Sequence, residues 1–276
     1  MTIIINPNEL NNKKNIRKGQ AVRPARSVKV RYRNALYDIT RMLSKNTQEI
    51  TSLFASSAPA LQIIDQLNNA ISLSQARADA EAERIAQQFL DDANIQNKVR
   101  FENMLRQSLG VDFLSTISGE NTTIALLAAR ATNVSLIKSI SSEHWSKVLL
   151  AVNQNLSGTL KIPLTSRLKQ IGGITTKRAK FIARDQTSKI VSQLNQARQY
   201  DAGIKSYVWR TTENEKVVGT PGGLYPKGNK KHGNHYKRNG KIFYWSDPPE
   251  DGHPGDPINC ECVAIPNIKI SELITL

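Results

Sequence analysis

The side chains of this protein that could do chemistry gather in one short stretch near the C-terminus. Three of the four histidines and both cysteines lie there: His232, His235, His253, Cys260 and Cys262. Thiolate and imidazole are donors that zinc prefers in proteins. Turn-forming residues are too dense around them for a long helix. A turn-rich segment with little apolar content needs a further source of order, and a metal ion would supply it.

A structural zinc ion needs four nitrogen or sulfur donors that converge from sharply turning segments. The Cys-x-Cys spacing suits this role, because alternate residues of an extended chain point to the same face. The alternative is a buried cysteine pair near surface histidines. His232 is a weaker candidate because it lies in a Lys-rich loop, and His144, beside Trp145 in a helical stretch, is predicted to be structural. The predicted zinc ligands are His235, His253, Cys260 and Cys262.

The same stretch admits a catalytic alternative, a metal-dependent hydrolase such as a nuclease or a toxin-like effector. A hydrolytic ion keeps one coordination position open and needs a nearby acid or base. His232 and His235 would hold the ion, with carboxylates from Glu213, Glu215, Asp247, Glu250 or Asp251. None of these spacings is diagnostic of a hydrolase, and the sequence has no Walker loop, nucleophile elbow or His-Glu-x-x-His. We therefore expect a structural site and no enzyme activity.

Positive charge is concentrated in two blocks. Residues 1–46 carry 11 Lys and Arg against 2 Asp and Glu, residues 161–189 carry 8 against 1, and the intervening residues 47–160 carry 8 against 11. Basic blocks around a near-neutral body predict contact with a polyanion, most simply a nucleic acid. The alternative is a solvated face. The predicted contact residues are Lys13, Lys14, Arg17, Lys18, Arg23 and Arg26 in the first block and Lys177, Lys180 and Arg184 in the second.

Hydropathy and cysteine usage restrict the location. No segment reaches the roughly 18 uninterrupted apolar residues that a membrane span needs, and the apolar run at residues 1–5 is too short for a signal peptide. Two cysteines separated by one residue make a strained disulfide. Free thiols in a reducing cytoplasm, available to a metal, are therefore favoured.

The spacing of apolar residues predicts an α+β protein with a mostly α-helical N-terminal two-thirds and a small turn-rich β module at the C-terminus. Residues 1–26 are expected to form a flexible basic arm, residues 27–202 a helical body, and residues 203–276 the β-rich His/Cys module with its tail. Such an arm has too few apolar residues to build a core of its own.

Within the body, the periodicity predicts helices from about residue 27, over 60–109, twice within 121–157, and from about 175 to 200. Breaks are expected at Pro59, Gly110 and Gly172-Gly173. Within the module, β-forming residues predict strands at 204–211, 241–245 and 260–265.

Several elements of this ending match a known pattern. They are Trp209-Arg210-Thr211, Asn214-Glu215-Lys216-Val217, His235 ahead of Gly240-Lys241, Pro248-Pro249, Gly252-His253-Pro254-Gly255 and Cys260-Glu261-Cys262. The run resembles the Mu F-like family of phage head morphogenesis (minor head) proteins, and the resemblance extends over about 133–266. Two departures stand out: the family's Cys-Arg-Cys has Glu261 as its middle residue here, and its Asp-Glu-Arg is Asn214-Glu215-Lys216.

The resemblance implies a minor capsid protein of a tailed phage that acts in head morphogenesis at the portal or in the capsid interior. Its expected partners are the portal protein, the major capsid protein and packaged double-stranded DNA. The expected location is the virion, at the head interior or the portal vertex, after assembly in the cytoplasm of the bacterial host. A nucleic-acid-binding protein unrelated to virions is a further alternative.

Overall fold

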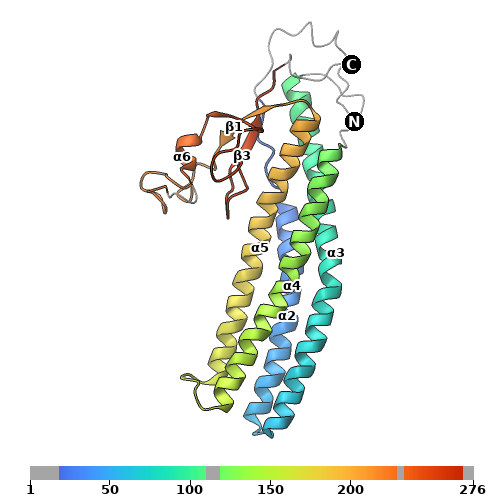
Figure 1. The fold of residues 1–276 in the computed structure, drawn as a ribbon, viewed down its shortest axis with the longest axis vertical. Helices are drawn as coiled ribbons and strands as arrows, with labels where there is room; N and C mark the ends of the chain where they lie inside the picture. Colours follow the sequence, from blue (N-terminus) through green and yellow to red (C-terminus); the bar gives the residue numbers. More distant parts are fainter. Residues whose placement is uncertain (1–18, 110–118, 229–232, 270–276) are drawn as a thin grey trace. The chain divides into compact units, whose positions relative to one another are not determined.

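The computed structural model describes residues 19–109, 119–228 and 233–269, and within them the α+β prediction is confirmed. Four long helices precede a small antiparallel sheet (Figure 1). The helices are α2 (Arg26–Ala55), α3 (Ala60–Leu109), α4 (Glu120–Leu156) and α5 (Leu164–Asp201). Lys13, Lys14, Arg17, Lys18 and His232 lie outside the described residues.

The chain divides into two compact units. One comprises residues 29–89 and 130–184 and is called the helical unit. The other contains the described parts of 1–28, 90–129 and 185–276 and is called the mixed unit. The sequence from residue 203 to 269, within the mixed unit, is called the C-terminal module.

The segments of α2, α3, α4 and α5 that belong to the helical unit lie side by side (Figure 1). Its core contains aliphatic residues such as Leu36, Leu43 and Ile137, each fully buried. Tyr32 stacks on Phe89 with ring centroids 3.9 Å apart, and its hydroxyl donates to Asn133 Oδ1 over 2.8 Å. These contacts join segments far apart in the sequence, so the unit depends on tertiary packing.

The helix ends confirm part of the prediction and correct two points. The break before Ala60 is where Pro59 predicts it. The two helices expected within 121–157 are one helix, α4, in which the hydroxyls of Ser139, Ser142 and Ser146 donate to carbonyls three or four residues earlier. Serines that bond back in this way do not have to end a helix.

The predicted interruption at Gly172-Gly173 is also wrong, because α5 runs through both glycines. Leu168 and Ile171 before the pair and Thr175 and Ala179 after it are buried on one face. Burial of that face outweighs the roughly 1 kcal/mol that each glycine costs in a helix interior.

The end of the predicted arm is packed in the mixed unit. Val22 and Ala25 are buried, and Asn195 Nδ2 donates to the carbonyl of Val22 over 2.9 Å. The sequence places residues up to 26 in a flexible arm, but at least Val22 to Arg26 belong to the folded part, with Arg26 as the first residue of α2.

The sheet of the C-terminal module has the order β2-β1-β3. β1 (Ser206–Arg210) pairs antiparallel with β2 (Ile242–Tyr244) and with β3 (Val263–Pro266). Tyr207 and Trp209, two residues apart on β1, are both fully buried, as side chains on one face of a strand should be. A single helical turn, α6 (His235–Arg238), lies between β1 and β2 in the sequence.

Hydrogen bonds tie the module to α5 within the mixed unit. Gln199 Nε2 donates to the carbonyl of Ala264, the Ser192 hydroxyl donates to the carbonyl of Pro254, and the Asn259 N–H donates to Asp185 Oδ1. Gly255 makes this close approach possible: its φ is +98°, and a Cβ there would lie 2.7 Å from Ser192 Cβ.

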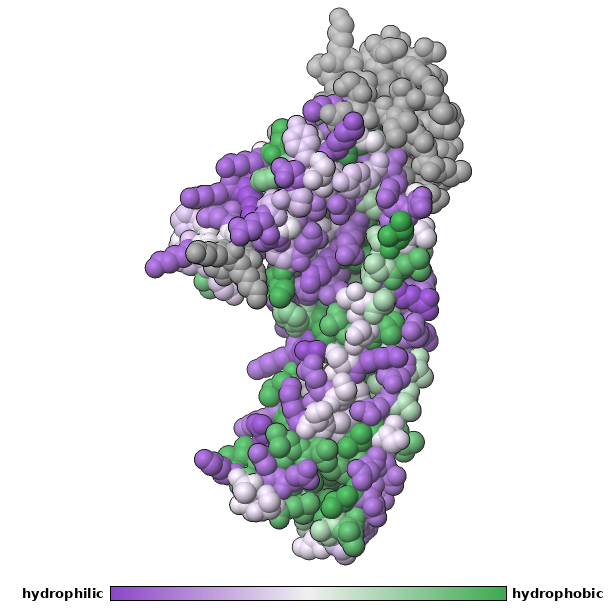
Figure 2. All heavy atoms as spheres, viewed as in Figure 1, coloured by the Kyte–Doolittle hydropathy of each residue, from purple (hydrophilic) through white to green (hydrophobic). Residues whose placement is uncertain are grey.

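Hydrophobic side chains also reach the surface of the helical unit. Figure 2 shows them gathered over the end that carries the α2–α3 and α4–α5 connections, whereas hydrophilic residues cover most of the visible surface of the C-terminal module. The exposed residues near that end include Leu61, Leu150, Leu156 and Ile162. An apolar surface of this kind commonly marks a contact site.

Candidate metal centre

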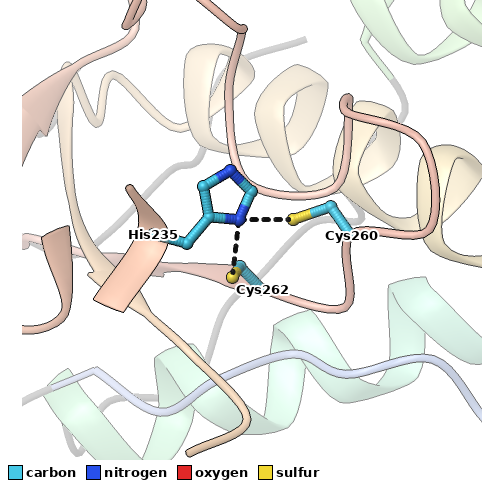
Figure 3. A group of neighbouring side chains, drawn as sticks. All are labelled: His235, Cys260 and Cys262. Atoms are coloured by element: carbon cyan, nitrogen blue, oxygen red, sulfur yellow. Dashed lines mark hydrogen bonds between the residues drawn. The ribbon is translucent and has the colours of Figure 1, made fainter. Parts of the chain in front are cut away.

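Three of the predicted zinc ligands meet inside the C-terminal module. The donor atoms of His235, Cys260 and Cys262 all lie within 4.8 Å of one another. His235 Nδ1 is 3.6 Å from each sulfur and points between them (Figure 3). All three residues are buried. The group brings together chain segments more than twenty residues apart.

Local structure sets the direction of each donor. Asn234 caps α6, accepting the N–H of Lys237 on its Oδ1 over 3.0 Å, and the next residue, His235, begins the helical turn. The two cysteines come from the segment that leads into β3. There Asn259 adopts a positive φ of 57°, and the Cys260 N–H donates to the carbonyl of Pro257. The sharp turn delivers both sulfurs to the side on which His235 lies.

Aromatic rings enclose the donors. Tyr207, Trp209, Trp245, Cys260, Cys262 and Ala264 form one buried cluster with Phe243 packed against it. The Trp209 ring lies 5.1 Å from the His235 ring in an edge-to-face arrangement. The module therefore has an apolar core of its own, larger than its turn-rich sequence indicates.

Electrostatics prepare the donors for a cation. Hydrogen bonding with Cys262 holds the pKa of Cys260 well below its ordinary value despite burial, and His235 reinforces the effect. The pKa of Cys262 is raised by the same hydrogen bond and by burial. Burial would lower the pKa of His235, but Cys260 and Asp251 hold it above 6.5. The lowered pKa of Cys260 favours the thiolate, which is the form of cysteine that binds metals.

The chemistry of this donor set fits a metal ion. Two sulfurs and one imidazole nitrogen are a common donor combination for zinc. The buried indole N–H of Trp209 has no hydrogen-bond partner of good geometry among the described residues. Trp209 is nevertheless near enough to Cys262 to lower the pKa of that thiol, against the larger raising effects of Cys260 and burial. A metal-bound thiolate would give that N–H an acceptor. The group can hold a metal ion.

The structure differs from the prediction at His253, which does not belong to this group. Its ring packs on Trp245 with centroids 4.8 Å apart, and its Nδ1 lies 2.9 Å from the Tyr207 hydroxyl. Its backbone N–H donates to Asp256 Oδ2 over 2.9 Å. The turn between Gly252 and Gly255, both at positive φ, aims the ring at the aromatic cluster. His253 therefore has a packing role here.

A bacterial protein is similar to almost the whole of this chain. An uncharacterized protein of Haemophilus influenzae is 31% identical over 275 residues, which cover 96% of this chain and 58% of the relative. The chain thus spans well under two thirds of the length of that relative. No family model matches the chain, and no solved structure matches it. Within the described residues, no helix is both long and apolar enough to span a bilayer.

His144 has the structural role that the sequence predicts. It is buried in the helical unit, with Nε2 2.9 Å from Thr47 Oγ1 and Nδ1 2.9 Å from Thr175 Oγ1. Its ring also meets Trp145 edge to face.

The described residues predicted to contact nucleic acid fall in both units. Arg23 and Arg26 of the mixed unit are exposed, and Arg23 Nη2 donates to the carbonyl of Thr211 over 3.5 Å. In the helical unit Lys177 and Lys180 are exposed and Arg184 is half-buried. The spacing of the last three along α5 places them on one stripe of that helix.

The sequence indicates no role in the site for Trp209 and offers Asp251 only as a carboxylate for a hydrolase. Asp251 Oδ2 lies 2.9 Å from His235 Nε2, and the Asp251 side chain is only 3% exposed. The only sequence signal for this contact is the position of Asp251 directly before the Gly252 turn.

Proposed function

We propose that this chain is a structural minor head protein of a tailed phage, of the Mu F-like type, whose C-terminal module is clamped by zinc. In this function the helical unit and the module dock on the portal or the inner capsid, and the basic residues contact packaged DNA. The location that follows is the head interior or the portal vertex of the virion.

The observation that carries the proposal is the convergence of the resembling residues in one module. The Gly252–Gly255 turn packs on α5 through Gly255, and the cysteines after it meet His235. Residues that are separated along the sequence in the family pattern thus come together in one compact module, which is fixed to a helix. The donors are buried inside this module, which suits an ion that holds its segments together, and the three protein donors leave a fourth coordination position for a further ligand.

The nearby carboxylate does not favour the hydrolase alternative. A hydrolytic site needs an acid or base free to act on water or substrate. Asp251 is engaged on both oxygens, by His235 Nε2 and by an ion pair with Arg238, whose guanidinium also lies 4.9 Å from the Trp209 ring. The exposed apolar end of the helical unit is, by contrast, suited to protein contact.

Particle purification tests the proposal directly. Phage heads purified from the host that carries this gene should contain the chain at a constant low ratio to the major capsid protein, measured by mass spectrometry. Heads treated with nuclease should retain it. Absence from purified heads while the protein is abundant in the lysate would contradict the proposal, as would zinc-dependent cleavage of DNA or peptide that is lost in His235→Gln.

DNA contact has a separate test. Removing residues 1–18 takes away Lys13, Lys14, Arg17 and Lys18 and leaves the buried Val22 in place. If these four side chains neutralise phosphates, the slope of log affinity against log salt should fall by up to about 3.6. Lys177→Gln with Lys180→Gln tests the second basic block in the same way, with an expected fall in the slope of up to about 1.8. Equal slopes for the truncated and full-length proteins would mean that the four basic residues do not contact DNA.

A further inference from the structure

We infer that Asp251 is the positioning residue of the metal centre, fixing the His235 ring so that Nδ1 presents its lone pair to the ion. The inference rests on the proposed metal site and adds a residue that acts through a ligand and does not touch the metal.

The two ring nitrogens of His235 face different partners. Nδ1 faces the sulfurs of Cys260 and Cys262 at 3.6 Å, whereas Nε2 lies 2.9 Å from Asp251 Oδ2. An imidazole that binds a metal through one nitrogen is neutral and carries its one N–H on the other nitrogen, and a carboxylate can only accept. The proton therefore belongs on Nε2 and the lone pair on Nδ1. Metal-bound histidines characteristically donate their second nitrogen in this way.

Asp251 is itself fixed in position by its neighbours. Its side chain is 3% exposed, and its other oxygen forms an ion pair with Arg238, whose side chain is 15% exposed. Arg238 comes from the last position of α6, the helical turn that His235 begins, and lies over the Trp209 ring. Trp209 in turn meets the His235 ring edge to face. Asp251, Arg238, Trp209 and His235 thus form a closed cycle of contacts that includes the imidazole.

Gly233 leaves room for the ion pair of Asp251 and Arg238. A Cβ at this position would lie 2.5 Å from Arg238 Nη2 and 2.9 Å from Asp251 Oδ2, and its φ is +59°. A larger residue would have to displace the end of the Arg238 or Asp251 side chain. The backbone two residues before His235 is thus shaped to admit the pair that orients it.

The test uses full-length protein and zinc, with affinity measured by competition against a chromophoric chelator. Asp251→Asn keeps the shape of the side chain and removes its charge, and we expect a 10–100-fold loss of zinc affinity. Asp247→Asn, at an exposed position in the same module, is the matched control and should bind as the wild type does.

Arg238→Gln separates positioning from general stability, because it removes the ion pair and leaves the contact between Asp251 and His235. It should weaken zinc binding less than Asp251→Asn. Cobalt loading gives a second readout: the ligand-field bands of Asp251→Asn should shift from those of the wild type, while the bands of Asp247→Asn should not. Equal zinc affinity and equal bands in Asp251→Asn and the wild type would overturn the role of Asp251 and leave the metal site itself standing. The same conclusion would follow if Arg238→Gln weakened zinc binding as strongly as Asp251→Asn.

A measurement on the wild type keeps the inference falsifiable if Asp251→Asn does not fold. In protein loaded with cadmium-113, nitrogen-15 spectra should show His235 protonated at Nε2 and coupled to the metal through Nδ1. A proton on Nδ1, or coupling through Nε2, would overturn the inference. Wild-type protein that binds neither zinc nor cadmium would overturn the metal site itself, and the role of Asp251 with it.

Discussion

Two histidines, one in each unit of this protein, are almost equally buried, but their pKa values are shifted in opposite directions. His144 in the helical unit is 1% exposed and His235 in the C-terminal module is 4% exposed. Burial and nearby Lys147 lower the pKa of His144 from 6.5 to about 4, whereas Cys260 and Asp251 raise that of His235 against the effect of burial. Depth alone therefore does not decide what a histidine does; its partners do.

The partners of His144 make it a packing residue. Thr47 and Thr175 contact its two nitrogens, yet both hydroxyls also lie within bonding distance of backbone carbonyls, of Leu43 and Ile171 respectively. A neutral imidazole supplies one N–H, so one hydroxyl must donate to the ring and give up its carbonyl. His235 instead lies between the Asp251 carboxylate and the sulfurs of Cys260 and Cys262, which is the environment of a ligand.

Removing both sulfurs should have the largest effect. In Cys260→Ser with Cys262→Ser we expect no bound zinc and local unfolding of the C-terminal module, with the helical unit intact. Structural zinc supplies about 10–16 kcal/mol in zinc-finger peptides, and even a fraction of that is comparable with the about 5–15 kcal/mol that stabilises a whole domain. Hydrogen exchange should show lost protection across β1, β2 and β3 and unchanged protection in residues 29–89.

The aromatic cluster is the alternative source of stability for the module. Tyr207, Trp209 and Trp245 would remain buried against one another without the metal. Unchanged protection and unchanged thermal stability in the double variant would mean that this cluster, and not zinc, holds the module together.

Exchanging one histidine at a time distinguishes a site with three protein donors from one with four. His235→Gln should lose zinc, because it removes the nitrogen that faces both sulfurs. His253→Gln should keep one zinc per chain, because that ring bonds the Tyr207 hydroxyl and packs on Trp245. Metal content after gel filtration is the measurement. Loss of zinc from both variants would restore His253 as a ligand and require the Gly252 turn to rearrange on binding.

Acid should destabilise the helical unit through His144. The unfolded residue takes up a proton below pH 6.5 and the folded one only near pH 4, so stability falls as pH drops between these values and is constant above them. From pH 8 to pH 5 the loss should be about 2 kcal/mol. Urea unfolding followed by circular dichroism measures it, and His144→Gln should flatten this part of the profile. The same pH dependence in both proteins would assign the acid sensitivity to other groups.

Local pattern was enough for much of the fold. The apolar stripe from residue 60 to 109 matches α3, and the β-formers around Trp209 match β1, because both signals are short-range and repeated. Donor chemistry was enough for His235, Cys260 and Cys262. It was not enough for His253, whose direction is set by the approach of Gly255 to Ser192 on α5. The role of Asp251 could not be predicted for the same reason, because its partners are brought to it by tertiary contacts.

The smallest effect we predict is at the glycine pair, where local propensity and the structure disagree. A Cβ at Gly173 would meet nothing within 4 Å, and α5 is continuous there, so Gly173→Ala should raise the stability of the helical unit by about 1 kcal/mol. Gly255→Ala is the contrasting variant: its φ of +98° and its contact with Ser192 should make the substitution destabilising. Thermal unfolding measures both. If Gly173→Ala instead lowers the melting temperature, the glycine pair is needed for a bend in α5, and the interruption that the sequence predicts there would describe the protein better than a straight helix does.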